Sequence, residues 1–163
     1  MQANCIDHLN IILDEVHVSG TNLNLEIPES ILLQNSTNVR RNLERISDLG
    51  VTIGIDNFGT GASAMKYLNE YPITMLKIDN SFIQNISTLK KGNVMIKSLI
   101  SLAENLKIDL IAEGVETQNQ AQILKELGCS NLQGYYYCRP LPSDEFKLFL
   151  SQYANYKNSP IIT

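Results

Sequence analysis

Short apolar runs alternate with helical patterns along most of the chain. The first pattern places apolar side chains at helical spacing between Ile6 and Val16, and Gly20 follows as a stop signal. Five later runs have the character of buried strands, at residues 23–27, 51–55, 73–78, 110–112 and, less clearly, 132–137. Helical patterns lie between or after these runs. The sequence therefore predicts an initial helix followed by about five strand–helix units.

The expected helices are bounded by residues that favour helix ends. Ser36 or Thr37 is suited to cap a helix that Gly50 would end. Residues suited to begin the later helices are Asn93, Thr117 and Ser143. These positions fix where each strand–helix unit begins and ends.

Strands that alternate with helices imply a parallel sheet with right-handed crossovers, either open and doubly wound or closed into a barrel. The apolar runs give way at their C-terminal ends to side chains able to do chemistry, namely Glu26, Asp56, Lys77 with Asp79, Glu113 and Gln133. Such residues on all the strands favour the (β/α)8 barrel, because an open nucleotide-binding sheet would concentrate its signal in one glycine-rich turn. A barrel needs eight strands, so we expect an incomplete barrel whose missing strands would precede Met1.

An incomplete barrel would expose surface that a closed barrel buries. Its parallel strands would leave two unpaired edges and an apolar interior open to water. We therefore expect the chain to pair with itself as a homo-oligomer or with a missing N-terminal segment.

Composition narrows the range of partners. The 163 residues carry a net charge of -4 and form no basic stripe, so binding to long nucleic acid is disfavoured. An anionic ligand would need metal ions to help hold it. We expect no membrane span and a cytoplasmic location, because no apolar run approaches ~18 residues and the N-terminus does not resemble a signal peptide. The cysteines, Cys5, Cys129 and Cys138, are expected to be reduced packing residues.

A barrel would bring four carboxylates and a lysine to one mouth. The carboxylates of Glu26, Asp56, Asp79 and Glu113 would repel one another unless cations compensate them, which indicates oxygen-bound Mg²⁺ or Mn²⁺. Any single one of them could equally be a helix cap or a solvated rim residue. Lys77 lies two residues before Asp79 and faces the same way in a strand. Lys77 could stabilise a phosphate or position a water, or it could simply pair with Asp79.

Six segments, in order, resemble the signature of EAL domains. They are LEIPES (25–30), DNFGTG (56–61), LKID (76–79), AEGVE (112–116), QGYYY (133–137) and RPLP (139–142). The resemblance covers residues 20–150 and leaves a leading helix at 1–19 and a tail at 151–163. It implies a modified, TIM-like (β/α)8 barrel. It also implies hydrolysis of the bacterial second messenger cyclic di-GMP to pGpG with two Mg²⁺ or Mn²⁺ ions.

The resemblance also implies roles for single residues. Lys77 would orient the nucleophilic water, and Glu113 would act as general base or water ligand. Positions that hold or support the metal ions would be Glu26, Asp56, Asn57 and Asp79. Residues that stabilise loops of the site would be Glu29 and Glu116, although Glu116 could equally be a plain helix N-terminal acid. Residues that contact the substrate would be Gln133 and Arg139.

Two departures from the EAL pattern bear on activity. Residues 1–19 contain no counterpart of the Glu of the Glu-Ala-Leu motif, nor of the asparagine that follows it, both metal ligands in active members. Asn57 stands where active members usually carry an aspartate, and an amide brings no negative charge. We therefore expect at most one ion to bind well and hydrolysis to be absent or weak. The alternative is a degenerate EAL domain that binds cyclic di-GMP or a protein partner without turnover.

Overall fold

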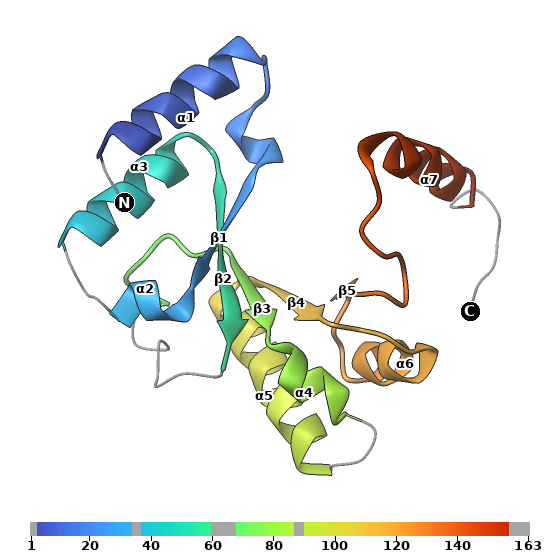
Figure 1. Cartoon of the computed structure of the whole chain (residues 1–163). Coiled ribbons are helices and arrows are strands. Elements are labelled where there is room, and N and C mark those ends of the chain that lie inside the picture. Colours follow the sequence, from blue (N-terminus) through green and yellow to red (C-terminus); the bar gives the residue numbers. More distant parts are fainter. Residues whose placement is uncertain (1–2, 34–36, 60–67, 87–89, 157–163) are drawn as a thin grey trace.

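The chain folds around one parallel sheet. The computed structural model describes residues 3–33, 37–59, 68–86 and 90–156 (Figure 1). Its strands are β1 (Asn24–Pro28), β2 (Thr52–Phe58), β3 (Met75–Ile78), β4 (Asp109–Glu113) and β5 (Asn131–Gln133). They lie in the order β1-β2-β3-β4-β5, and every neighbouring pair is parallel. Because this order follows the sequence, the described sheet matches an arc of a barrel rather than a doubly wound sheet.

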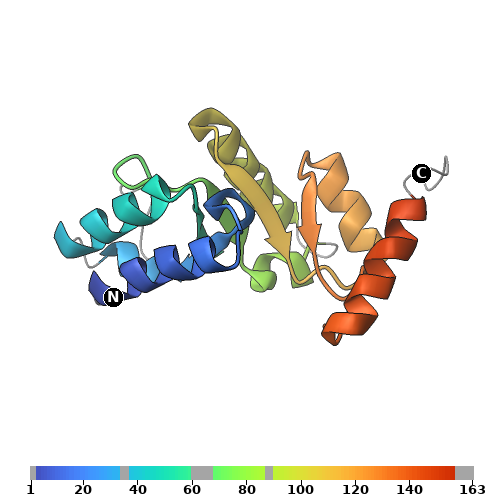
Figure 2. The same cartoon turned by 90° about the horizontal axis from the view of Figure 1, so that it is seen from above.

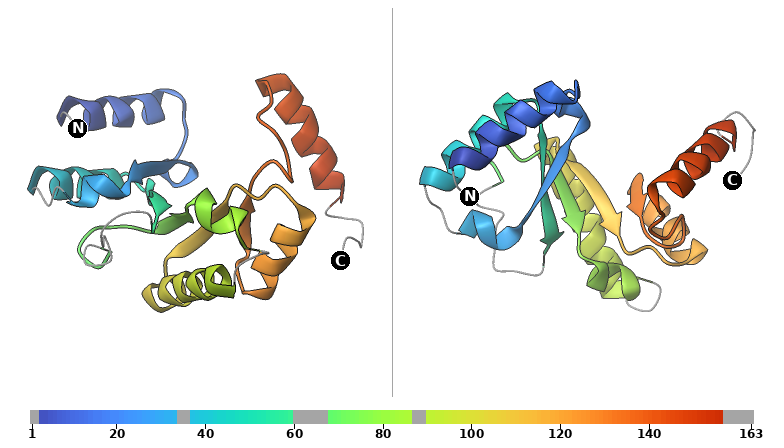
Figure 3. Two further views of the ribbon diagram at one scale, coloured as in Figure 1. Left: turned by 60° about the horizontal axis from the view of Figure 1, so that its bottom comes forward. Right: turned by 45° about the horizontal axis from the view of Figure 1, so that its top comes forward.

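Helices connect and flank the strands. They are α1 (Ala3–Glu15), the 3-10 turn η1 (Gly20–Asn22), α2 (Glu29–Leu33), α3 (Thr37–Asp48), α4 (Asn80–Gln84), α5 (Lys90–Leu106), α6 (Gln118–Glu126) and α7 (Ser143–Tyr156). α1 lies beside α3, and α4 and α5 pack together against β4 (Figures 1 and 3). α1 and α7 lie at opposite ends of the molecule, as the view from above shows (Figure 2). None of the described helices is long and apolar enough to cross a bilayer.

The two faces of the sheet differ in chemistry, because side chains alternate between them along each strand. One face is buried in the core, and its side chains include Ile27, Ile53, Ile55, Leu76, Ile78 and Ala112. Helices supply further residues of that core, among them Leu43, Ile83, Ile96 and Leu124. The opposite face carries Asn24, Glu26, Asp56, Lys77, Glu113, Asn131 and Gln133, with Pro28, Gly54, Met75 and Ile111 among its members without a polar side chain. The prediction of an apolar barrel interior open to water is therefore wrong, because the face on that side is mainly polar.

Helix ends agree with the capping signals in part. α3 begins at Thr37, and Thr117 caps α6 in a capping box with Gln120, as predicted. α1 ends before Gly20, because His17 takes a left-handed backbone with φ 54 and the N–H of Val18 donates to the Leu13 carbonyl at 3.0 Å. These are features of a Schellman cap.

The helix expected to begin at Asn93 starts earlier. α5 begins at Lys90, so Asn93 lies inside the helix and does not cap it. The residues directly before α5, 87–89, lie outside the described ranges. Gly92 lies inside α5 and does not interrupt its backbone. The helix therefore starts about one turn before Asn93, the residue expected to begin it.

The last strand is shorter than the aromatic run predicts. β5 ends at Gln133, and residues 135–137 form a turn. Gly134 approaches the connection after β4 so closely that a Cβ atom there would lie 2.1 Å from the carbonyl oxygen of Val115. That oxygen accepts the N–H of Tyr136 at 3.0 Å, which draws the chain out of the sheet. The prediction of a buried strand through residue 137 is therefore wrong for Tyr135, Tyr136 and Tyr137, because all three are exposed.

The three cysteines differ in environment. Cys129 is buried, and this burial raises the pKa of its thiol. Cys138 is partly buried, whereas Cys5 is exposed. The prediction of packing roles is therefore wrong for Cys5.

Candidate functional site

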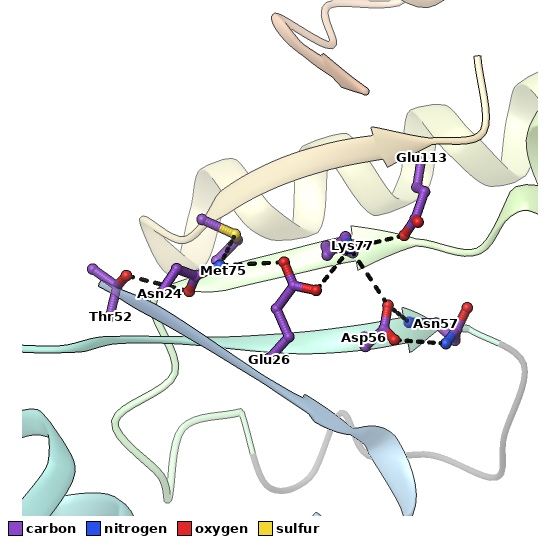
Figure 4. A network of polar contacts seen from close by, with 8 residues as sticks. All are labelled: Asn24, Glu26, Thr52, Asp56, Asn57, Met75, Lys77 and Glu113. Atoms are coloured by element: carbon purple, nitrogen blue, oxygen red, sulfur yellow. Dashed lines mark hydrogen bonds and ion pairs between the residues drawn. The ribbon is translucent and has the colours of Figure 1, made fainter. Parts of the chain in front are cut away.

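Lys77 lies at the centre of the polar cluster on the open face of the sheet. Its side chain extends from β3 and is only 6% exposed. Its ammonium nitrogen lies 2.8 Å from Glu26 Oε2 and 2.9 Å from Glu113 Oε2 (Figure 4). It also lies 3.8 Å from Asp56 Oδ1. Carboxylates from β1, β2 and β4 thus converge on one cation from β3, since parallel strands end at the same edge of a sheet.

These contacts decide the charge state of Lys77. Burial by itself would lower the pKa of Lys77, because it disfavours the charged form. Hydrogen bonds to Glu26 and Glu113, and the negative charges of both carboxylates, outweigh burial and raise the pKa above its ordinary value. Lys77 is therefore a cation at physiological pH and cannot serve as a general base. The sequence also allowed an ion pair between Lys77 and Asp79, but the structure pairs Lys77 with Glu26 and Glu113 instead.

Asp56 and Asn57 occupy an irregular segment of β2. Ile55 pairs with Leu76 and Phe58 pairs with Ile78, so β2 has an extra residue in this interval. Asn57 takes a left-handed backbone with φ 54, a conformation that asparagine tolerates better than most residues. The backbone N–H of Asn57 donates to Asp56 Oδ1 at 3.0 Å, and its side-chain amide donates to Asp56 Oδ2 at 2.9 Å (Figure 4).

Asp79 follows β3 and caps the next helix. Its side chain accepts the backbone N–H of Ser81 at 2.9 Å, which satisfies a free donor at the start of α4. β3 ends at Ile78, so Asp79 does not share the strand with Lys77. Asp79 nevertheless lines the same cleft as Glu113. It thus combines a structural role with a position beside the cluster.

A cleft of about 720 Å³ adjoins the cluster on the side of β4 and β5. Predicted site residues that line it are Asn57, Asp79, Glu113, Glu116, Gln133 and Arg139. The guanidinium of Arg139 lies 5.2 Å from the centre of the Tyr135 ring, a cation–π contact on the cleft wall. Glu26, Asp56 and Lys77 are not among the lining residues, so the cluster meets the cleft through Asn57 and Glu113.

The two expected loop-stabilising glutamates lie in different surroundings. Glu29 is the first residue of α2 and is 7% exposed, which is low for an acidic side chain. Glu116 is exposed and lines the cleft, and its backbone N–H donates to Gln120 Oε1 at 2.8 Å. Glu29 is therefore placed beside β1 within the fold, and Glu116 belongs to the capped start of α6.

Asn24 is a member of the cluster that sequence reasoning missed. Its amide donates to Glu26 Oε1 and to Met75 Sδ, both at 3.4 Å, and its oxygen accepts from Thr52 Oγ1 at 3.2 Å (Figure 4). The two-residue period of a strand places Asn24 on the same face as Glu26. That spacing is the signal that could have identified it.

The cluster fits a bound divalent cation in part. Three carboxylates face one ammonium, which leaves a formal charge of -2 for a cation to balance. Among the described residues, no three Asp, Glu, His or Cys side chains are arranged to hold a metal ion together. Mg²⁺ often binds through one or two carboxylates and keeps several waters. The residues present therefore fit one hydrated ion better than a pair enclosed by protein ligands.

Comparison with known proteins shows relatives along most of the chain. The model of the EAL domain family matches residues 1–140. The signaling protein YkoW of Bacillus subtilis is 41% identical over 128 residues, which are 78% of this chain and 16% of YkoW. The cyclic di-GMP phosphodiesterase NbdA of Pseudomonas aeruginosa is 36% identical over 152 residues, 93% of this chain and 19% of NbdA. The chain thus spans less than a fifth of either relative.

A solved structure shares the fold as well as the sequence. The PaMucR phosphodiesterase in complex with cyclic di-GMP superimposes with a TM-score of 0.83 at 34% identity. The match covers 89% of this chain and 59% of that one. These matches confirm the predicted fold class and the predicted resemblance to EAL domains. The chain belongs to the EAL domain family.

Proposed function

We propose that this chain carries the catalytic lysine and general base of a cyclic di-GMP phosphodiesterase and that its own turnover is weak. The main support is Lys77, a buried cation held by carboxylates from three other strands. Further support comes from the two relatives named as phosphodiesterases, one of them solved with cyclic di-GMP. A buried lysine that only stabilised the fold would not need three acidic partners at the strand ends.

The reaction gives each residue a distinct task. The oxygen of a water forms a bond to phosphorus, one P–O ester bond of the ring breaks, and the leaving ribose oxygen takes up a proton to give pGpG. Glu113 accepts a proton from the water, because it lies between the cluster and the cleft. Lys77 orients that water and stabilises negative charge on the phosphate. The hydrogen bond between these side chains keeps the base beside a fixed positive charge.

A divalent Mg²⁺ or Mn²⁺ ion, when bound, polarises the phosphate and lowers the pKa of a coordinated water. We assign Glu26 and Asp56 to hold it, with Asp79 as an additional carboxylate in the adjoining cleft. The nucleotide is anionic and so is this part of the molecule, so binding depends on a cation as well as on Lys77. The described carboxylates do not enclose a metal ion, so we expect weak binding of the ion and therefore slow hydrolysis.

The remaining site residues act on the nucleotide or on the walls of the site. Gln133 and Arg139 line the cleft and are assigned to contact the substrate. Glu29, buried at the start of α2, is assigned to hold the segment that begins at Asp56. Glu116 is assigned to keep the turn after β4 in place, since its backbone belongs to the cap of α6.

The second candidate is a domain that binds cyclic di-GMP or a protein partner without turnover. It is favoured by the arrangement of the described carboxylates, which does not enclose a metal ion. Neutral Asn57 beside Asp56 favours it as well. The two candidates differ in whether pGpG is produced.

Chromatographic detection of pGpG separates the candidates. The chain is incubated with cyclic di-GMP and Mn²⁺ beside Lys77→Met, Glu113→Gln and an exposed control, Glu145→Gln on α7. We expect slow hydrolysis by the wild type and the control, and a loss of about 100-fold or more in the two site variants. Calorimetry with the same nucleotide gives binding separately. Binding by all four proteins with no pGpG from any would support the second candidate and contradict the first.

A further inference from the structure

Asn57 is the residue at which β2 leaves the regular strand pattern. Ile55 and Phe58 are both buried on the core face, although strict alternation would place position 57, not 58, on that face. The extra residue and the left-handed backbone of Asn57, φ 54, account for the shift. The irregularity turns the Asn57 side chain toward its neighbour in the sequence. It also leaves this side chain exposed at the edge of the cleft.

Asn57 contacts both carboxylate oxygens of Asp56. The backbone N–H donates to Oδ1 at 3.0 Å, and Nδ2 of the side chain donates to Oδ2 at 2.9 Å. Asp56 Oδ1 also lies 3.8 Å from the Lys77 ammonium. Each oxygen of Asp56 therefore already faces a donor from the protein. A divalent cation would bind through the lone pairs of these same oxygens.

Chemistry fixes which end of the Asn57 amide faces Asp56. With the amide reversed, its carbonyl oxygen would face a carboxylate oxygen at hydrogen-bond distance, and two acceptors would repel. The nitrogen is therefore the end directed at Asp56. A ligand role, which the EAL resemblance implies for this position, would instead use the amide oxygen.

We propose that Asn57 is a positioning residue that holds Asp56 through its amide, at a position where the EAL resemblance implies an acidic ligand, and that this contact weakens divalent-metal binding. The amide provides the positive end of a dipole to Asp56 Oδ2, so part of the compensation that a cation would supply comes from the protein. A cation must displace this contact or share the oxygen with it. The inference rests on the proposed function in one respect, namely that Asp56 is a metal ligand.

Replacement by glycine separates the two roles of Asn57. Asn57→Gly retains the backbone N–H and suits the left-handed conformation, while it removes both the donor and the oxygen of the side chain. If the amide restrains Asp56, its loss should tighten Mn²⁺ binding, by about tenfold if the bond has the usual strength of one to a charged group. If the amide oxygen is a ligand, the same change should weaken Mn²⁺ binding.

The experiment is a titration of the whole chain with Mn²⁺ alone. Binding is measured by calorimetry and, separately, by the electron paramagnetic resonance signal of free Mn²⁺. His17→Gly is the matched control, since His17 has the same φ of 54 and lies at the end of α1. We expect His17→Gly to match the wild type and Asn57→Gly to bind more tightly. Asp56→Asn, made in both the wild-type and Asn57→Gly backgrounds, should remove the gain. A gain that persists without Asp56, or weaker binding by Asn57→Gly, would overturn the inference.

These outcomes are independent of hydrolysis. Tighter Mn²⁺ binding by Asn57→Gly together with no pGpG from any variant would support the inference and contradict the proposed activity. Unchanged Mn²⁺ affinity in Asp56→Asn would show that Asp56 is not a ligand. That result would overturn the inference through its premise, whatever the activity.

Discussion

Lys77 combines deep burial with three acidic neighbours, whereas the other lysine with a described ion pair, Lys147, is 72% exposed beside Asp144. Lys77→Met should therefore lower the free energy of unfolding by about 2–3 kcal/mol, because it leaves Glu26 and Glu113 without their cation. The carboxylates are 35–38% exposed, and water moderates the loss. Lys147→Met should change it by less than about 1 kcal/mol. Urea unfolding measures both, and equal effects of the two variants would contradict the assignment.

The raised pKa of Lys77 gives this contribution a definite pH range. A folded-state pKa above the unfolded value of about 10.4 means that the stabilisation is complete below that value and disappears as pH rises through the folded pKa. The difference in unfolding free energy between wild type and Lys77→Met should thus stay constant from about pH 6 to 9 and shrink above about pH 10.5. Urea midpoints at several pH values test this. A difference that vanished near neutral pH would be inconsistent with a raised pKa.

Most positions that gather around Lys77 could be predicted one by one, but their pairings could not. The end of each apolar run marked Glu26, Asp56 and Glu113, because strand C-termini are where a barrel directs its chemistry. Local spacing left Asp79 open as a partner of Lys77, yet β3 ends one residue earlier and Asp79 caps α4. The Glu26 partner lies 51 residues away in the sequence, so only the register of the sheet brings it to Lys77.

At the scale of elements, the turn after β5 depends on a close approach of two backbones. A Cβ atom on Gly134 would lie 2.1 Å from the Val115 carbonyl oxygen, whereas one on Gly54 would have its nearest neighbour at 3.5 Å. Gly134→Ala should therefore lower stability by about 1–3 kcal/mol and displace the turn at residues 135–137, together with Arg139 after it. Gly54→Ala, inside β2, is the control and should be better tolerated. Chemical denaturation of both variants decides, and a smaller loss for Gly134→Ala would contradict this packing.

Element types could be predicted better than element ends. Apolar runs with helical patterns between them identified each strand of the described residues, since burial of one sheet face imposes that pattern. The aromatic run after Gln133 has strong strand propensity, but the contact between Gly134 and Val115 overrides it. Such a contact joins segments that are far apart in the sequence, so local sequence patterns do not predict it. The same limit applies to the irregular segment at Asn57, which depends on the pairing of β2 with β3.

At the scale of the whole molecule, alternation of strands and helices predicted the sequential parallel sheet. The polar character of its open face was not predicted. The apolar runs were interpreted as strands buried on both faces, and this hid the alternation of Glu26 with Ile27 and of Lys77 with Ile78. The polar side chains around Lys77 occupy that face, where an apolar interior was expected. The order of the described strands leaves β1 and β5 as the edges of the sheet.

These two edges lead to a prediction about assembly. Edge strands present unpaired backbone donors and acceptors that can pair with another chain. We expect the chain to self-associate, so that light scattering coupled to size exclusion gives a mass above that of one chain that rises with concentration. Asn131→Lys, a charge on exposed β5, should reduce the association. A single-chain mass at every concentration would contradict this expectation.

The central claim is that the Lys77 cluster is the place where a phosphate of cyclic di-GMP is bound and cleaved. The most direct measurement is a crystal structure of Glu113→Gln with Mn²⁺ and cyclic di-GMP, since loss of the proposed base should preserve the nucleotide. We predict a phosphate oxygen within about 3 Å of Lys77 Nζ and anomalous density for Mn²⁺ beside Glu26 and Asp56. Nucleotide bound elsewhere on the chain, with Lys77 still paired only with carboxylates, would contradict the account.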